Sequence, residues 1–163
     1  FPASLMTWPQ ILYLLPVVPA TVLAVADLRH RTIPMNWLVA FGLCVPLPSV
    51  FLSSAGTILY NILTNTLLLG WVFGGVWIYL KLRCRRPGNL FRQYVGSGDL
   101  VFALLLTPFA PLPQYLLLLL GGCMGGLAYW IGVRITVRYS ATIPLVTFFS
   151  LAFIVCTLYR LIR

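Results

Sequence analysis

The sequence predicts an all-α fold, a polytopic membrane helix bundle with six transmembrane helices, built as one integral-membrane domain over residues 1–163. Three observations predict it. The chain is 61% hydrophobic and only 8% charged, which leaves too few charges to cover a surface that faces water. Its charge-free stretches are long enough to span a bilayer. Turn-forming residues interrupt the two longest of these stretches.

Four stretches carry no Asp, Glu, Lys or Arg: residues 1–26, 32–80, 100–133 and 139–159. A hydrocarbon core about 30 Å thick needs roughly 20 apolar residues per helix. The first and last stretches therefore fit one helix each. The two middle stretches are too long for one helix, so each of them must turn back once.

Two short segments supply these turns. The segment "LSSAGT" at 52–57 is small, polar and contains glycine. The segment "TPFAPLPQ" at 107–114 holds three prolines, which remove backbone donors and bend the chain. The fourth helix is short, about 18 Å at 1.5 Å per residue, so five helices and a re-entrant segment are the alternative. The six helices are expected at residues 9–28, 36–53, 57–81, 98–109, 114–133 and 141–160.

The chain has a net charge of +9, and the positions of its basic residues indicate how it is oriented in the membrane. Nine of the 11 basic residues fall in the predicted loops that follow the first, third and fifth helices, and only Arg160 and Arg163 fall at the other end. Basic loops stay in the cytoplasm, which places these three loops there and both chain ends outside. Such loops also suit anionic lipid headgroups, so membrane lipids are expected partners and nucleic acid is not. The nine are Arg29, Arg31, Lys81, Arg83, Arg85, Arg86, Arg92, Arg134 and Arg138.

The four cysteines are widely scattered, at Cys44, Cys84, Cys123 and Cys156, and no CxxC pair occurs. This spacing is not that of a metal site or a disulfide framework. Small apolar packing residues are the expected role of these thiols. No metal and no cofactor is therefore predicted.

Asp27 and Asp99 are the only acidic residues of the chain. Asp27 lies near the end of the first predicted helix, which exits to the cytoplasm, and Asp99 lies at the start of the fourth, which enters from it. Both carboxylates are therefore expected at one depth, at the cytoplasmic edge of the membrane. A structural ion pair of Asp27 with nearby arginines, and stabilisation of a helix N-terminus by Asp99, are the alternatives. Ionisable residues in membrane segments are more often functional.

Two adjacent carboxyl groups can act as an acid–base pair, because repulsion between two negative charges keeps one group protonated while the other is ionised. The charged group can then take a proton from water while the neutral one polarises a peptide carbonyl, as in aspartic proteases. In "GSGD", Gly96 and Gly98 allow a partner helix or an extended substrate to approach the backbone closely.

The segment "ADLRHRTIP" at 26–34, followed by GxGD at the start of a fourth helix, resembles the type IV prepilin peptidases. These are six-helix intramembrane aspartyl proteases related to archaeal preflagellin peptidases. The resemblance implies that Asp27 and Asp99 are catalytic, supported by Gly96, Gly98 and the Ile33-Pro34 pair. "ATIPLVTFF" at 141–149 looks like the proline-bearing last helix of the family.

The resemblance also implies an activity and a location. The chain is expected to be an aspartic endopeptidase that removes basic leader peptides from prepilin-like proteins, either type IV pilins or pseudopilins. The active site is expected at the cytoplasmic face of the prokaryotic cytoplasmic (inner) membrane. The oligomeric state and the pilus or secretion system that it serves stay open.

The chain departs from the family pattern in three places. Met35 separates Ile33-Pro34 from Asn36, and Val101 stands where the family often has lysine. The cytoplasmic zinc-binding segment with paired CxxC motifs, which the larger members associate with N-terminal methylation, does not occur. The resemblance therefore implies cleavage without methyltransferase activity.

Two rival functions share the pair of acids. A small proton- or cation-coupled transporter would use Asp27 and Asp99 to bind the ion, but its carboxylates are expected near the bilayer midplane. A presenilin-like protease shares GxGD, but it has a Tyr-Asp pair and a Pro-Ala-Leu motif. Here Ala26 precedes Asp27, and Pro-Ala-Leu is absent. The polar loop at 83–95 is expected either to gate the Asp99 motif or to be a static anchor on lipid headgroups.

Overall fold

Helix is the only regular structure in the part of the chain that the computed structural model describes, residues 8–83, 96–136 and 143–162. The predicted all-α class is therefore confirmed for these residues. The loop at 83–95 lies, apart from Arg83, outside them, and so do Arg85, Arg86, Arg92 and Arg138. The described helices are α1 (Trp8–Leu14), α2 (Val17–His30), α3 (Met35–Cys44), α4 (Pro46–Leu52), α5 (Ala55–Arg83), α7 (Ser97–Leu105), α8 (Leu112–Thr136) and α9 (Leu145–Ile162).

Each of the six predicted segments contains helix, but the first two are each divided. α1 and α2 meet at a turn that contains Pro16, and α3 and α4 meet at Val45, just before Pro46. A proline in a helix has no N–H to donate and its ring clashes with the preceding turn. These prolines therefore end one helix and begin the next without reversing the chain.

Within the described residues, four helical stretches are long and apolar enough to cross a membrane: Ile11–His30, Met35–Leu52, Ala55–Tyr79 and Leu112–Ile135. The helical part of α9, Leu145–Leu161, is apolar but shorter. α7 ends at Leu105, although helix was expected to 109, so this boundary was wrong. Its nine residues rise about 13.5 Å at 1.5 Å per residue. α7 is thus about half as long as a hydrocarbon core is thick.

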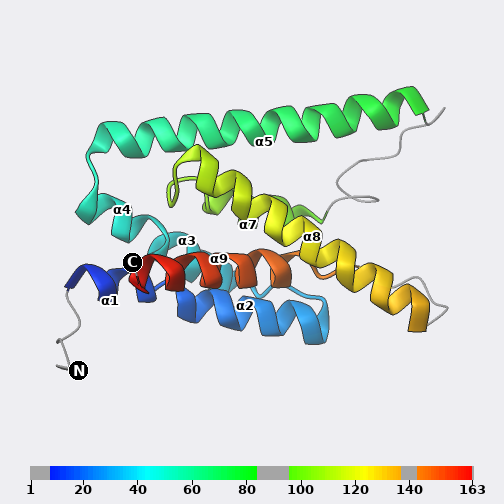
Figure 1. Ribbon diagram of the computed structural model, residues 1–163, viewed down its shortest axis with the longest axis horizontal. Coiled ribbons are helices and arrows are strands. Elements are labelled where there is room, and N and C mark those ends of the chain that lie inside the picture. The colour runs from blue at the N-terminus through cyan, green and yellow to red at the C-terminus, as the bar shows by residue number, and fades with distance from the viewer. Residues whose placement is uncertain (1–7, 84–95, 137–142, 163) are drawn as a thin grey trace.

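α9 is the central helix of the bundle, with α2 packed along one side and α8 along the other (Figure 1). The short α7 contacts α3 and α9, and α5 runs along the outer edge, where it contacts α4 and α8. Glycines bring α8 and α9 close together. A Cβ on Gly122 would overlap the ring of Phe149, and one on Gly125 would lie 2.8 Å from Cδ1 of Phe148.

An aromatic cluster fills the centre of the bundle. The rings of Phe41 and Phe102 stack with their centroids 4.6 Å apart, and Phe153 meets Phe41 edge-on at 5.5 Å. Phe109 packs against Phe153 at 4.7 Å. These residues come from α3, α7, α9 and the turn after α7, so the cluster joins α7 and α9, two of the three helices that carry the candidate site, to α3.

The turn between α7 and α8 is not helical, and polar side chains satisfy its buried carbonyls. Asn65 of α5 donates through Nδ2 to the carbonyl oxygens of Thr107 and Ala110, at 2.8 Å each. Ser49 of α4 donates to the carbonyl of Pro108 at 2.9 Å. Buried backbone groups must find such partners, so these contacts fix where α7 stops.

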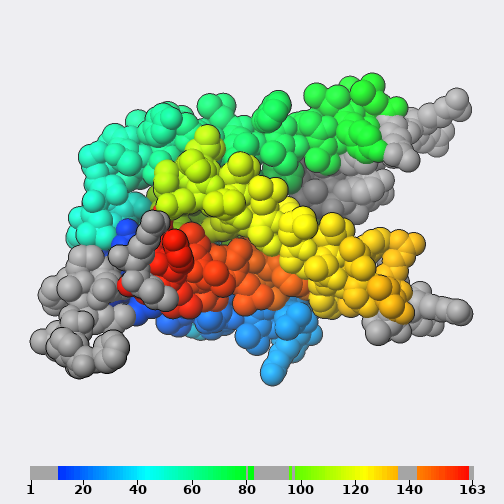
Figure 2. All heavy atoms as spheres, viewed as in Figure 1, coloured from blue at the N-terminus to red at the C-terminus, as the bar shows by residue number. Residues whose placement is uncertain are grey.

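The helices lie alongside one another in the space-filling view (Figure 2), and many of their large apolar side chains are exposed. Trp71 and Leu67 of α5 and Leu117 of α8 are more than two-thirds exposed. α2, α5 and α8 end, and α9 begins, toward one end of the molecule (Figure 1). Arg29, Lys81 and Arg134, which lie near the ends of α2, α5 and α8, are therefore grouped at that end, whereas Arg160 lies at the opposite end of α9.

Candidate active site

Asp27 lies in the last turn of α2, and its side chain is only 7% exposed. Its Oδ2 accepts hydrogen bonds from the backbone N–H and from the hydroxyl of Thr147, at 3.0 Å each. The same hydroxyl lies 3.1 Å from the carbonyl oxygen of Ala24, a second acceptor for its single proton. Asp27 is therefore fixed by one residue from the other end of the sequence.

Thr147 can do this because it lies in the first turn of α9. The first N–H groups of a helix have no partner within the helix, and that end of the helix favours negative charge. Pro144 directly precedes α9 and sets where it begins. The carboxylate of Asp27 therefore satisfies one of these first-turn N–H groups.

Asp99 lies in the first turn of α7 and is partly buried. Its carboxylate interacts with the backbone of Val146 of α9 and with that of Gly96, the residue that precedes α7. Asp27 is close enough for the charges of the two carboxylates to interact. The consecutive residues Val146 and Thr147 thus hold one aspartate each, and the structure brings together two groups that lie 72 positions apart.

The two glycines of the GSGD segment each make room for one side chain. A Cβ on Gly96 would lie 2.7 Å from Oδ2 of Asp99, and a Cβ on Gly98 would overlap Cδ1 of Ile33. Pro34 follows Ile33 and caps α3, with its carbonyl accepting from the N–H groups of Trp37 and Leu38 at 3.1 Å. All six residues singled out in the sequence therefore border one small region.

Sequence reasoning missed the contribution of α9. Val146 and Thr147 are neutral residues in an apolar stretch, and their partners are more than 45 positions away. The available signals were the segment "ATIPLVTFF" at 141–149, which contains both residues, and their distance from Pro144, which places them in the first turn of a helix, where N–H groups need acceptors.

Arg31 fastens the end of α2 to α8. Its backbone has the left-handed φ of 55° and its N–H donates to the carbonyl of Asp27 at 3.1 Å. Its guanidinium donates to the hydroxyl of Tyr129 at 3.2 Å and lies 5.9 Å from the centroid of that ring. The backbone that carries Asp27 is thus tied to a neighbouring helix.

The described residues contain no group of three His, Cys, Asp or Glu side chains that could hold a metal ion. What the site offers is two interacting carboxylates beside the N-terminus of a helix. Such a pair can share one proton and act as a base and an acid in the same reaction.

Comparison of the chain with family models, with curated proteins and with solved structures gives no match.

Proposed function

We propose that this chain is an intramembrane aspartyl endopeptidase that removes basic leader peptides from prepilin-like proteins at the cytoplasmic face of the membrane. One observation carries the proposal: the only two acids of the chain interact, and consecutive residues of α9 hold them. If each aspartate only formed an ion pair with a nearby arginine, the two carboxylates would not need to lie close to one another. The resemblance to type IV prepilin peptidases is carried by the segments that contain these two aspartates and by the segment at 141–149.

The proposed reaction uses the pair as one unit. The ionised carboxylate takes a proton from water, the water oxygen attacks the scissile carbonyl carbon, and the protonated carboxyl group donates its proton to the carbonyl oxygen. Collapse of the tetrahedral intermediate breaks the C–N bond. The leaving amine takes one proton and the new acid returns one, so the pair again shares a single proton.

Membrane placement is part of the proposal. The long apolar helices and the exposed apolar side chains suit lipid contact. Both aspartates lie in a first or last helical turn at the end where basic residues gather. Basic ends favour the cytoplasm, so the pair would meet a substrate whose basic leader remains there while its apolar helix lies in the bilayer.

The transporter alternative fits these positions less well. An ion carrier is expected to hold its acids near the bilayer midplane, often at breaks within helices. The helix breaks of this chain at Pro16 and Val45 are far from both acids in sequence, and Asp27 and Asp99 lie at helix ends.

The test is cleavage of a prepilin-like protein co-expressed with the chain, scored by a mobility shift and by mass spectrometry of the new N-terminus. The resemblance implies a substrate with a glycine at the end of its leader, so the wild-type chain should produce a cut after that glycine. Asp27→Asn and Asp99→Asn should each abolish the cut, because asparagine keeps the size of aspartate but cannot take up a proton. Both variants should elute from size exclusion in detergent as the wild type does. Substantial cleavage by either purified variant contradicts the proposal.

A further inference from the structure

Arg31 follows α2 in a backbone conformation that favours glycine. Its φ is 55°, and within the described residues no other non-glycine residue has a positive φ. The left-handed conformation at the end of a helix is most often taken by glycine, because a Cβ is disfavoured there. An arginine in this place strains the backbone where glycine would not. Such an outlier points to a use for its side chain.

The side chain of Arg31 reaches across to α8. Its guanidinium donates to the hydroxyl of Tyr129 at 3.2 Å and lies 5.9 Å from the centroid of the tyrosine ring. The ring of Tyr129 in turn packs against Phe148, with the two centroids 5.7 Å apart. Tyr129 therefore contacts both the residue that caps α2 and a residue at the start of α9.

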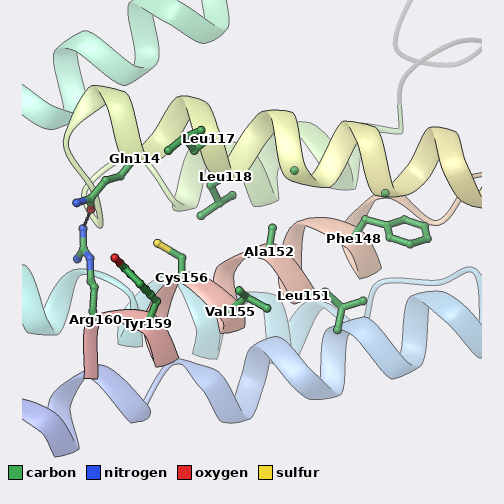
Figure 3. A pocket seen from close by; sticks show the side chains of 12 residues that line it. Gln114, Leu117, Leu118, Phe148, Leu151, Ala152, Val155, Cys156, Tyr159 and Arg160 are labelled. Carbon is green, nitrogen blue, oxygen red and sulfur yellow. Dashed lines mark hydrogen bonds between the residues drawn. The ribbon is translucent and has the colours of Figure 1, made fainter. Parts of the chain in front are cut away.

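Two glycines let α8 lie close to the start of α9. Phe148 lies at one end of the apolar groove between these helices, and its side chain faces α8 (Figure 3). A Cβ on Gly125 would lie 2.8 Å from Cδ1 of Phe148, and one on Gly126 would lie 3.1 Å from Cγ2 of Ile143. Gly125 precedes Tyr129 by about one helical turn. The missing side chains therefore bring Tyr129 within reach of its partners.

These contacts form a closed series that contains Asp27. One turn of α2 leads from Asp27 to Arg31, whose N–H donates to the carbonyl of Asp27 at 3.1 Å. The series continues through Tyr129 to Phe148. Phe148 directly follows Thr147, which donates to the carboxylate of Asp27. The helices α2, α8 and α9 are thus tied together within about one turn of the candidate site.

We propose that Arg31 and Tyr129 position the two carboxylates. They hold the end of α2 against the start of α9, so that Asp27 meets its donors on Thr147 and stays beside Asp99. We call these two residues the Arg31–Tyr129 strap. Both act through Asp27 and are positioning residues. The inference rests on the proposed function, in which the geometry of the two carboxylates sets the rate.

The conformation of Arg31 separates positioning from ordinary stabilisation. Arg31→Gly relieves the left-handed backbone and keeps the N–H that donates to Asp27, so the midpoint of thermal unfolding in detergent should stay the same or rise. The same variant lacks the guanidinium. Its kcat should fall about 5- to 20-fold with KM unchanged, since a misplacement of about 1 Å can cost about 100-fold. A contact that only stabilised the fold would lower the midpoint and the rate together.

Tyr129→Phe tests the other half of the strap. Phenylalanine can still pack against Phe148, but it offers no oxygen to the guanidinium of Arg31. Its kcat should also fall. The double variant with Arg31→Gly should be no slower than Arg31→Gly alone, because both changes break the same contact.

Two controls match these variants. Arg31→Gln should slow cleavage, whereas Arg29→Gln, the same loss of charge at an exposed position two residues earlier, should keep the wild-type kcat. Tyr60→Phe removes a hydroxyl from an exposed tyrosine of α5 and should also cleave as the wild type does.

Carbon NMR in detergent gives a readout that does not need cleavage. Aspartate with an isotope-labelled carboxyl carbon labels Asp27 and Asp99, and the Asp27→Asn and Asp99→Asn variants assign their signals. Arg31→Gly and Tyr129→Phe should each shift the signal of Asp27, because its surroundings change when α2 moves on α9. Arg29→Gln should leave that signal in place.

The proposal is overturned if Arg31→Gly and Tyr129→Phe keep both the wild-type kcat and the wild-type signal of Asp27. It is also overturned if Arg31→Gly lowers the unfolding midpoint together with the rate. A wild type that cleaves no prepilin-like substrate would contradict the protease, and the signal of Asp27 in the two variants would then decide the role of the strap.

Discussion

The backbone N–H and the hydroxyl of Thr147 both donate to Oδ2 of Asp27, at 3.0 Å each, across 120 positions of sequence. One residue at the start of α9 therefore sets the position of a carboxylate at the end of α2. Thr147 does not belong to the GxGD segment or to the segment around Asp27. Under the proposed function it is a positioning residue, since it acts through Asp27.

Replacing Thr147 by valine should lower the cleavage rate about 10- to 100-fold. Valine keeps the shape and the backbone N–H but loses the hydroxyl, and a hydrogen bond to a charged group contributes roughly 1.5–3 kcal/mol. The pH–rate profile should move as well, because the hydroxyl is one of the donors that hold the proposed acid–base pair in place. Thr147→Ser should restore both the rate and the profile.

Thr157→Val is the matched control, since the buried hydroxyl of Thr157 bonds only within α9, to the carbonyl of Phe153 at 2.8 Å. If Thr147→Val keeps both the wild-type rate and the wild-type pH profile, Thr147 has no positioning role.

Gly98 should tolerate no side chain as long as Ile33 keeps its Cδ1. Gly98→Ala places a methyl group on Cδ1 of Ile33, and overpacking of this kind costs about 1–3 kcal/mol. The midpoint of thermal unfolding in detergent should fall, and cleavage should fall with it because Asp99 lies in the next position. Adding Ile33→Val, which removes Cδ1, should restore much of the loss.

Gly70→Ala is the control for this prediction. Gly70 lies in the middle of α5 with open space around its Cα, and alanine favours helix over glycine by about 1 kcal/mol. Its unfolding midpoint should stay the same or rise. If the Gly98→Ala single variant and the double variant with Ile33→Val unfold at the same temperature, the contact with Ile33 is not what requires glycine.

Charge-free length and turn residues were enough to predict where the helices lie. The turns near 52–57 and 107–114 both fall between helices, and all six predicted segments contain helix. The division at Pro16 was missed, because a proline in an apolar stretch can either kink a helix or end it. The early end of α7 was also missed. It depends on Asn65 and Ser49, which are distant in sequence and bind the carbonyls of the turn.

The candidate site was predicted only in part, because some of its contacts join residues that are distant in sequence. Asp27 and Asp99 stand out because acids are so rare in this chain. The order of the predicted helices places the end of the first and the start of the fourth on one side of the membrane, so both aspartates were expected there. Gly98 and Ile33 were singled out separately, but only the fold shows that one makes room for the other. Thr147 carries no signal of its own, since threonine is unremarkable in an apolar helix, and its role comes from long-range packing.

Asn65 should be a main support of the turn between α7 and α8. Asn65→Ala removes two hydrogen bonds to carbonyls of that turn, and each contributes roughly 0.5–1.5 kcal/mol. The free energy of unfolding in detergent should fall by about 2 kcal/mol. Asn36→Ala is the control, because Asn36 is exposed at the start of α3. Equal stability of both variants would show that the turn does not need Asn65.

The proposed pair of Asp27 and Asp99 should govern the pH dependence of cleavage as a single unit. At low pH both carboxyl groups are protonated and neither can act as the base, while at high pH both are ionised and neither can act as the acid. The profile of kcat/KM against pH should therefore be bell-shaped, and its two limbs belong to the pair rather than to either residue. Cleavage assays of the wild type across the pH range give this profile.

Cross-linking tests the proximity of the same pair without relying on activity. Cysteines are introduced at positions 27 and 99 in a chain whose own cysteines, Cys44, Cys84, Cys123 and Cys156, have been replaced. Short bifunctional reagents should join the two positions, because Val146 and Thr147 hold the native side chains side by side at the start of α9. A cysteine pair at 27 and 124 is the control, since Met124 is exposed on α8. Substrate-bound protein is tested too, because catalytic contacts often tighten only in the complex. If positions 27 and 99 fail to join in both states, the two carboxylates do not form a pair and the proposed mechanism, in which they share one proton, is wrong.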